Sequence, residues 1–191
     1  EPELQKVSKK IGRVVLAPNL ADILGEQGRR FVAIGTGSTG NAFLQNPNAE
    51  RSGGATIHPE FCLPRDLHQE LINHFGPWPE KTMPNEQRLE RAVRVLTEYI
   101  VPDMDPAVMV FWCNEPDSTQ HATGVGSEAA ERSLALADLQ LGRLLAWLKD
   151  TGRDQNTDVL VISDHGYSTV SEVVDIKVAV QKAGFPSGEG P

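Results

Sequence analysis

The sequence predicts an α/β fold in which a mainly parallel sheet lies between layers of helices, a three-layer α/β/α arrangement. Apolar runs at residues 30–34, 107–113 and 158–163 are typical of buried strands, and stretches with the helical period of apolar residues alternate with them. The two later runs are almost continuously apolar, as strands covered on both faces usually are. Strands that alternate with helices favour crossover connections, so we expect most strands to be parallel.

The first half of the chain begins with a capped helix and a strand. Asn19 is typical of a helix N-cap, and the helix after it is expected to end at Gly28. The strand at residues 30–34 then leads into the glycine-rich turn Gly35–Gly40. Glycine and proline recur through residues 41–64, which predicts an irregular excursion there.

Helical patterns dominate the rest of the chain. Asp66 begins a segment with capping-box spacing, which predicts a helix that ends at Gly76. Apolar residues recur with a helical period over 86–100 and again over 127–149, where leucines form a stripe along one face. A last helix is expected at 171–183. These helices and the apolar runs alternate as an α/β fold requires.

The composition is that of an ordinary globular protein, and we expect residues 1–191 to belong to a single domain. The formal net charge is −8 and Lys and Arg form no cluster, which argues against nucleic-acid binding through the phosphate backbone. No apolar stretch approaches the length of a membrane span. Cys62 and Cys113 lack the spacing of a metal site, and we interpret Cys113, which ends an apolar run, as a buried free thiol.

Two short acid–histidine clusters follow the second and third apolar runs. Asp117 and His121 come after the second run, and Asp164 and His165 come after the third. Carboxylate oxygen and imidazole nitrogen are the usual ligands of zinc and related divalent ions. Because open α/β sheets build their sites beyond the carboxyl ends of strands, the clusters predict a two-metal centre that hydrolyses phosphate or related esters.

Simpler interpretations of these residues stay open. An Asp-His pair after a strand is more often a cap or a hydrogen-bonding element, and Asp117 could start a turn after Pro116. The segment has little helical pattern, so we expect a loop to fold Asp117 and His121 around one ion. Glu115 could orient a ligand or could be solvated. Surface or hydrogen-bonded roles are expected for three other histidines, namely His58, His68 and His74.

The two clusters resemble those of the nucleotide pyrophosphatase/phosphodiesterase family of the alkaline phosphatase superfamily. The resemblance is carried by Asn114-Glu-Pro-Asp-Ser-Thr-Gln-His121, by the amphipathic helix behind it and by Val161-Ile-Ser-Asp-His-Gly166. It is strong over residues 107–170 and weaker over residues 20–61. The combination of both segments at this long interval is specific, whereas either segment alone would be a moderate signal.

The resemblance implies a fold, an activity and a set of metal ligands. Asp117 and His121 match ligands of one zinc ion, and Asp164 and His165 match ligands of a second; manganese or calcium is possible in related members. The implied fold is alkaline phosphatase-like, and the implied substrate is a small-molecule phosphodiester or nucleotide. The family attacks phosphorus with a metal-activated Thr or Ser and then hydrolyses the phosphoryl-enzyme. Its members are often periplasmic, extracellular or membrane-attached.

The sequence departs from the family pattern on both sides of the clusters. No segment before Asp117 matches the early strand with its Asp ligand and nucleophile, and no His follows His165. The resemblance therefore implies a nucleophile upstream of Glu1 and a further His ligand downstream. We expect residues 1–191 to be an internal piece, about half of such a catalytic domain, with little activity as an isolated chain.

The glycine-rich turn offers a competing function. Gly35-Thr-Gly-Ser-Thr-Gly40 after a strand is the formal dinucleotide fingerprint, with Glu60 near the distance of its acidic partner, so a non-catalytic dinucleotide-binding module is one alternative. Residues 41–47 allow barely one helical turn, however, and a pyrophosphate site needs a helix N-terminus there. Another superfamily member, such as a phosphomutase or sulfatase, is a second alternative. Three hydroxyls of the turn are interpreted as structural rather than nucleophilic, namely Thr36, Ser38 and Thr39.

Overall fold

The structure of the chain is a computed structural model that describes residues 2–185, and these residues divide into two units. The first unit ends at Leu160 and contains a sheet with the helices that cover it. The second unit begins at Val161, and its described residues form one helix, α10 (Ile176–Lys182). The elements that position Asp117 and His121 all belong to the first unit.

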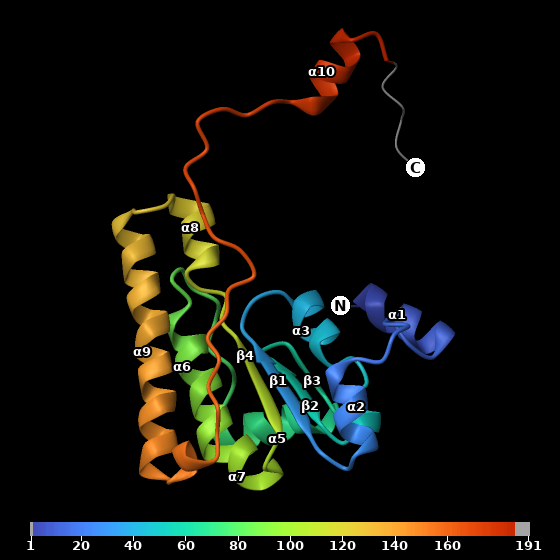
Figure 1. The fold of residues 1–191 in the computed structure, drawn as a ribbon, viewed down its shortest axis with the longest axis vertical. Coiled ribbons are helices and arrows are strands. Elements are labelled where there is room, and N and C mark those ends of the chain that lie inside the picture. Colours follow the sequence, from blue (N-terminus) through green and yellow to red (C-terminus); the bar gives the residue numbers. More distant parts are fainter. Residues whose placement is uncertain (1, 186–191) are drawn as a thin grey trace. The chain divides into compact units, whose positions relative to one another are not determined.

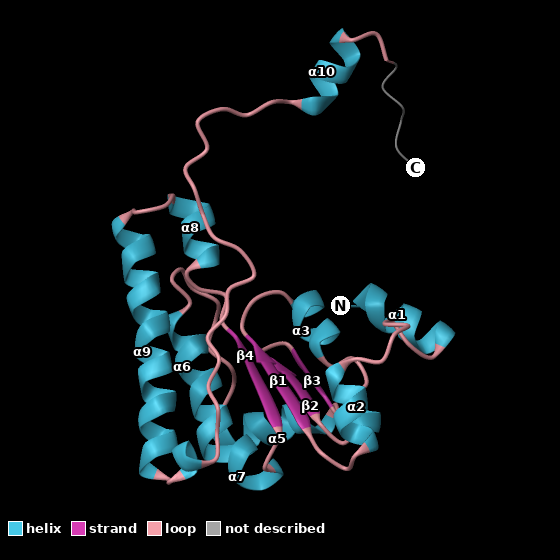
Figure 2. Cartoon of the chain, viewed as in Figure 1, coloured by secondary structure: helices cyan, strands magenta, loops and turns pink. Residues whose placement is uncertain are grey.

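The sheet of the first unit has four strands in the order β3-β2-β1-β4 (Figure 1; Figure 2). The inner strand β1 (Phe31–Gly35) pairs in parallel with β2 (Ala55–His58) and with β4 (Val108–Trp112). At one edge, β3 (Phe61–Leu63) runs antiparallel to β2. The predicted α/β fold with a mainly parallel sheet is therefore confirmed, in a small and mixed form.

Helices connect and cover the strands of this unit. In chain order they are α1 (Pro2–Ile11), α2 (Leu20–Glu26), α3 (Thr39–Gln45), α4 (Ala49–Ser52), α5 (Asp66–Phe75), α6 (Glu86–Val95), α7 (Val101–Met104), α8 (Asp117–Thr123) and α9 (Glu128–Asp150). A π-helical turn, η1 (Leu96–Ile100), continues α6, and a 3₁₀ turn, η2 (Arg153–Gln155), follows α9. No helix among the described residues is both long and apolar enough to cross a membrane.

Both faces of the sheet are covered, because side chains alternate along each strand. On one face, Val32 and Ile34 of β1 belong to a core cluster with residues of α5, α6 and η1. On the other, Phe31 and Ala33 belong to a second cluster with residues of α2. These side chains are all at most 5% exposed. The predicted three-layer α/β/α arrangement follows from these two clusters.

The helices predicted from capping signals are confirmed. Asn19 caps α2 through a capping box, in which Asn19 Oδ1 accepts the Asp22 N–H at 2.8 Å and Asp22 Oδ2 accepts the Asn19 N–H at 3.3 Å. Helix α5 begins at the expected residue and stops at Gly76, whose φ of 80° ends the helical backbone. Ser127 caps α9 by accepting the N–H of Ala130. Helix α6 and η1 together cover the expected 86–100.

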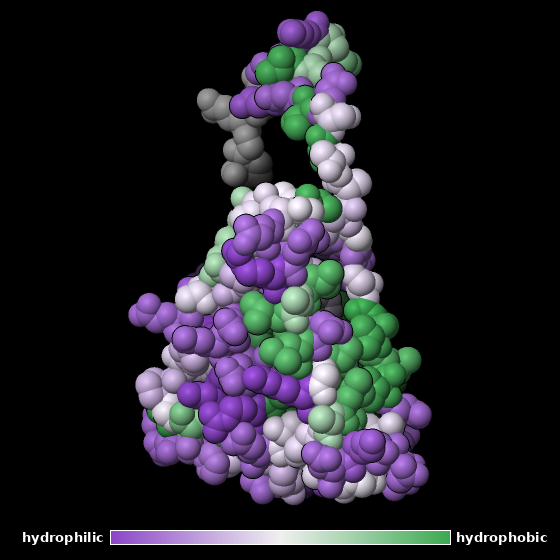
Figure 3. Space-filling model, turned by 90° about the vertical axis from the view of Figure 1, so that its left-hand side faces the viewer, coloured by the Kyte–Doolittle hydropathy of each residue, from purple (hydrophilic) through white to green (hydrophobic). Residues whose placement is uncertain are grey.

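The leucine stripe of α9 is only partly covered. This helix packs along α6, and its buried residues are Ala130, Ser133 and Gln140 rather than leucines. Leu134 is 57% exposed and Leu145 is 44% exposed. Figure 3 shows the side of the molecule on which α9 lies, where apolar side chains gather in patches bordered by polar ones. The helical period predicted the helix correctly, but its fully buried positions lie outside the leucine stripe.

The prediction of an irregular excursion over residues 41–64 is wrong. Most of α3, the short helix α4 and the strands β2 and β3 lie in this range. Glycine and proline separate these short elements instead of preventing them. Gly54 precedes β2, and a Cβ at this position would lie 2.0 Å from the Phe31 carbonyl oxygen, so glycine permits the close approach to β1.

The predictions for the C-terminal part are partly wrong. Residues 158–163 form no strand in the described structure, and Leu160 is 86% exposed. An apolar run becomes a strand only where a neighbour takes up its backbone N–H and C=O groups, and the described sheet ends at β4. Helix α10 is shorter than the expected 171–183 because Asp175 caps it, accepting the N–H of Val178 at 3.0 Å.

Candidate metal centre

Asp117 and His121 lie one turn apart on α8, directly beyond the carboxyl end of β4 (Figure 1). His121 Nε2 is 3.5 Å from Asp117 Oδ1, and the side chains are 69% and 46% exposed, respectively. The spacing of four residues places both side chains on one face of the helix. A helix therefore carries the pair, and the expectation of a loop is wrong.

Helix α8 forms because the residues just before it satisfy its first turn. Pro116 lacks an N–H and is therefore tolerated at this end of a helix. Its carbonyl oxygen accepts the N–H of Gln120 at 2.9 Å, and the carboxylate of Glu115 accepts the N–H of Thr119 at 3.2 Å. Hydrogen bonds of this kind at the N-terminal end determine whether a helix of seven residues forms, and a helix this short shows no clear apolar period in the sequence.

A buried polar network joins β1, the start of α6 and α8. Asn114 Oδ1 accepts hydrogen bonds from Thr36 Oγ1 at 2.6 Å and from Asn85 Nδ2 at 2.9 Å. Asn85 Nδ2 also lies 3.3 Å from the carbonyl oxygen of Thr36. Burial of these groups is tolerated because most of them bond to one another, although Asn85 Oδ1 has no hydrogen-bond partner. The members are all at most 5% exposed, namely Thr36, Asn85, Asn114, Glu115 and Thr119.

Glu115 belongs to this network, which excludes one of the two interpretations that its sequence position left open. The side chain is 4% exposed and its carboxylate accepts hydrogen bonds from Asn85, Asn114 and Thr119. It is therefore not solvated. Its neighbour Cys113 is a free thiol whose Sγ lies 3.1 Å from the Glu115 carbonyl oxygen. Burial raises the pKa of Cys113 to about 11, which marks an inert thiol and agrees with the interpretation made from sequence, although the residue is only half-buried.

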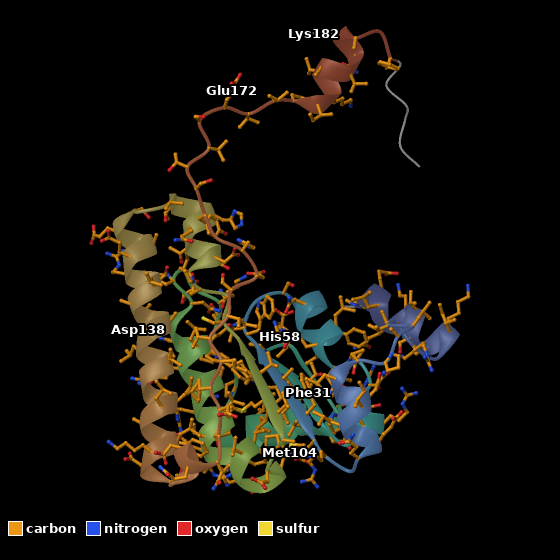
Figure 4. The ribbon with its side chains drawn as sticks, in the orientation of Figure 1. Phe31, His58, Met104, Asp138, Glu172 and Lys182 are labelled. Carbon is orange, nitrogen blue, oxygen red and sulfur yellow. The ribbon has the colours of Figure 1, made fainter. Side chains whose placement is uncertain are left out.

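The glycine-rich turn is packed against the same network. A Cβ on Gly37 would lie 3.3 Å from Asn114 Cβ, and the hydroxyl of Thr36 is engaged by Asn114. His58, labelled in Figure 4, ends β2 with its Nε2 3.2 Å from the Gly37 carbonyl oxygen, and its Nδ1 accepts the Glu60 N–H. Burial lowers the pKa of His58 below the ordinary 6.5. The structural interpretation of Thr36 and the hydrogen-bonded role of His58 agree with this geometry.

Helix α3 is longer than the sequence indicated. It begins at Thr39, inside the glycine-rich turn, and reaches seven residues instead of a single turn. The hydroxyl of Ser38 accepts the N–H of Asn41 at 3.3 Å and so takes up a donor that a pyrophosphate would need. The turn therefore fits a structural role better than dinucleotide binding.

Asp164 and His165 lie in the second unit, within irregular chain. His165 Nε2 is 3.8 Å from Asp164 Oδ1, and the same oxygen accepts the backbone N–H of His165 at 3.1 Å. The two side chains are 57% exposed for Asp164 and 49% for His165. The ring of His165 contacts that of Tyr167 at 5.3 Å between centroids. Local contacts bring this pair together without a helix or a strand.

The donor types and spacings of both pairs fit divalent zinc. Two ligands at the usual bond lengths of one tetrahedral zinc ion are about 3.4 Å apart. Asp117 and His121 stand near this separation at 3.5 Å, and Asp164 and His165 are slightly farther apart at 3.8 Å. Each pair would offer two of the four ligands of such an ion, and among residues 2–185 no three or more His, Cys, Asp or Glu side chains gather in a group that could hold a metal.

Sequence reasoning gave no role to Asn85 or Asn114. Asn85 precedes α6 and has the position of an N-cap, yet its side chain makes no cap bond and turns instead to Asn114 and Thr36. These partners are 29 and 49 positions away in the chain. No local signal could have revealed the contact, because only the folded chain creates it.

The fold and the Asp117–His121 pair define a class, namely α/β proteins with candidate functional residues just beyond a strand end of a mainly parallel sheet. Comparison with known proteins identifies the family. Residues 5–187 match the family model described as type I phosphodiesterase/nucleotide pyrophosphatase. This match covers most of the chain, so the chain belongs to the type I phosphodiesterase/nucleotide pyrophosphatase family. The observed α/β fold is consistent with the alkaline phosphatase-like arrangement expected from sequence.

Curated relatives are similar over shorter stretches. Ectonucleotide pyrophosphatase/phosphodiesterase family member 1 is 35% identical over 78 residues in both Mus musculus and Rattus norvegicus, which is 40% of this chain and 9% of each relative. Family member 3 of Mus musculus is 26% identical over 102 residues, 52% of this chain and 12% of that protein. The chain thus matches 9 to 12% of the length of these relatives. No solved structure matches the chain.

Proposed function

We propose that this chain is part of a hydrolase that cleaves phosphodiester or nucleotide pyrophosphate bonds of a small-molecule substrate at a two-zinc site. Asp117 and His121 would hold one ion, and Asp164 and His165 the other. The observation that carries the proposal is the Asp117–His121 pair at the end of a parallel strand, with a spacing suited to a shared ion. Membership of the phosphodiesterase family supports the reaction class.

Asp117 and His121 would contribute to the reaction by holding an oxygen donor and a nitrogen donor in place. Zinc, when bound, would polarise a phosphoryl oxygen and lower the pKa of the attacking group, and manganese or calcium could take its place. Asp117 offers a carboxylate oxygen and His121 a ring nitrogen, which are donor types that zinc prefers. The buried network fixes the helix that carries both residues.

Zinc titration of the 191-residue chain tests the ligand assignment. Asp117→Asn and Asp164→Asn keep the side-chain volume and remove the anionic oxygen, so each should abolish or weaken uptake of one ion by more than about tenfold. Asp138→Asn, a change at an exposed carboxylate on α9 labelled in Figure 4, is the matched control. Calorimetry and metal analysis measure the uptake. Zinc binding that neither ligand variant alters would contradict the assignment.

We also propose that the isolated chain turns over little substrate. Four protein donors are fewer than two tetrahedral ions require, and the Thr36 hydroxyl is engaged in the buried network rather than available as a nucleophile. Hydrolysis of bis-p-nitrophenyl phosphate, measured with and without zinc, provides the test. Zinc-dependent turnover that disappears in Asp117→Asn would refute this statement and leave the family assignment standing.

The alternative functions receive less support from the geometry. The packed Gly37 and the capped start of α3 argue against a dinucleotide site. Saturable NAD binding that is weakened in Gly37→Ala and unaffected in Asp164→Asn would reverse this preference. A phosphomutase or a sulfatase of the same superfamily would use similar donors, and the family match favours the phosphodiesterase.

A further inference from the structure

A carboxylate is buried two residues before the proposed ligand Asp117. Glu115 is 4% exposed, and withdrawing a carboxylate from water is costly unless its oxygens are satisfied. Its Oε1 lies 3.0 Å from the backbone nitrogen of Asn85 and 3.4 Å from Nδ2 of Asn114. Its Oε2 accepts the backbone N–H of Thr119 at 3.2 Å and the hydroxyl of the same residue at 2.7 Å. Each oxygen therefore has two donors.

These four donors come from three parts of the fold. Asn85 stands at the start of α6, Asn114 follows β4, and Thr119 lies in the first turn of α8. Hydrogen bonds to this carboxylate thus connect α8 with the end of β4 and with the start of α6. A helix of seven residues is marginal without such support, because its own hydrogen bonds barely offset the cost of ordering it.

The position of Thr119 makes this tie specific for the ligand pair. Thr119 is two residues after Asp117 and two before His121, and it is fully buried. Its N–H and its hydroxyl both donate to Glu115 Oε2, and these two hydrogen bonds to one atom limit rotation of α8 about its axis. The rotation of α8 decides where the side chains on its exposed face point.

We propose that Glu115 is a positioning residue, which fixes the direction in which Asp117 and His121 present their ligand atoms. This inference rests on the proposed zinc site. Without the carboxylate tie, α8 would have to be ordered when the metal binds, and the cost of that ordering would reduce the affinity. Glu115 would act through the hydrogen bonds that it accepts from buried groups, and it would not need to contact the metal.

Glu115→Gln tests the role at nearly constant size. Whichever oxygen the amide nitrogen replaces, it faces a backbone N–H that can only donate, so at least one of the four bonds is lost. Zinc affinity at His121 should fall roughly ten- to hundredfold, the range found for residues that orient metal ligands. Imidazole ¹⁵N–¹H correlation spectra of the labelled full chain, assigned with His121→Gln, follow His121 and His165 separately during the zinc titration. Affinity at His165 should not change, nor should either affinity in the exposed control Glu131→Gln.

Two variants of Thr119 provide a milder test. Thr119→Val removes the hydroxyl that lies 2.7 Å from the carboxylate and keeps the backbone N–H, whereas Thr119→Ser retains the hydroxyl. We expect weaker zinc binding at His121 in the valine variant and near-normal binding in the serine variant. Because both substitutions change the same buried position, a purely steric defect would affect both.

The outcomes separate this inference from the function on which it rests. Unchanged affinity at His121 in folded Glu115→Gln, or an equal loss at His121 and His165, would overturn the positioning role. If circular dichroism shows that Glu115→Gln does not fold, equal affinity at His121 in the two Thr119 variants overturns it instead. Absence of zinc binding at His121 in the unmodified chain would refute the proposed zinc site and the inference with it.

Discussion

Replacing Thr36 by valine removes one hydroxyl from the buried network at almost constant volume. The hydroxyl is fully buried and donates to Asn114 Oδ1 at 2.6 Å. After the change, that oxygen keeps the hydrogen bond from Asn85 at 2.9 Å, so it is not left without a donor. The lost bond costs about 0.5–1.5 kcal/mol of unfolding free energy, and the Asn114 N–H, 3.4 Å from the hydroxyl, loses a weak acceptor. We expect a total loss of about 2 kcal/mol.

Urea unfolding followed by tryptophan fluorescence measures this loss, since Trp112 ends β4 next to the network. For a chain of this size the same loss corresponds to a lower melting temperature by about 4–8 °C. The denaturant slope m should not change, and Thr157→Val, at an exposed position, should have little effect. A loss below about 0.5 kcal/mol would show that the Thr36 hydroxyl contributes no net hydrogen bond to the stability of the network.

Three further substitutions have definite expected outcomes. Gly54→Ala should destabilise by about 3 kcal/mol or more, because its Cβ would lie 2.0 Å from the Phe31 carbonyl oxygen. Gly142→Ala, in a helix and with nothing within 4 Å of the added Cβ, should stabilise by about 1 kcal/mol; opposite signs in urea unfolding check the pair. Burial lowers the pKa of His58, so below pH 6.5 the unfolded chain binds a proton at this residue more readily than the folded chain does. The free energy of unfolding therefore decreases as the pH is lowered below 6.5. His58→Gln should lose this part of the pH dependence, which is at most about 1.4 kcal/mol per pH unit. The exposed control His74→Gln should retain it, and urea unfolding at several pH values measures both variants.

The sequence predicted those elements whose causes are local. Asn19 caps α2 with a partner three positions away, and the apolar run before Asn114 formed β4 as expected. The four-residue strand β2 was missed because it exists only through pairing with β1. Residues 158–163 show the converse, since an apolar run without a paired neighbour in the described structure stays irregular. Strand formation depends on two paired segments, and the sequence of one segment does not identify its partner.

The candidate site divides in the same way. Asp117 and His121 could be proposed as ligands from the sequence because donor type and spacing are local properties, and the structure places the two side chains 3.5 Å apart. Glu115, two residues earlier, could not be assigned, because its role depends on burial, and burial depends on Thr36 and Asn85. The contact between Thr36 and Asn114 spans 78 positions, so no motif contains it. If the proposed site is correct, a chain could retain every proposed donor and still bind metal poorly once this network was lost, since the motif would supply the ligand atoms and the fold their direction.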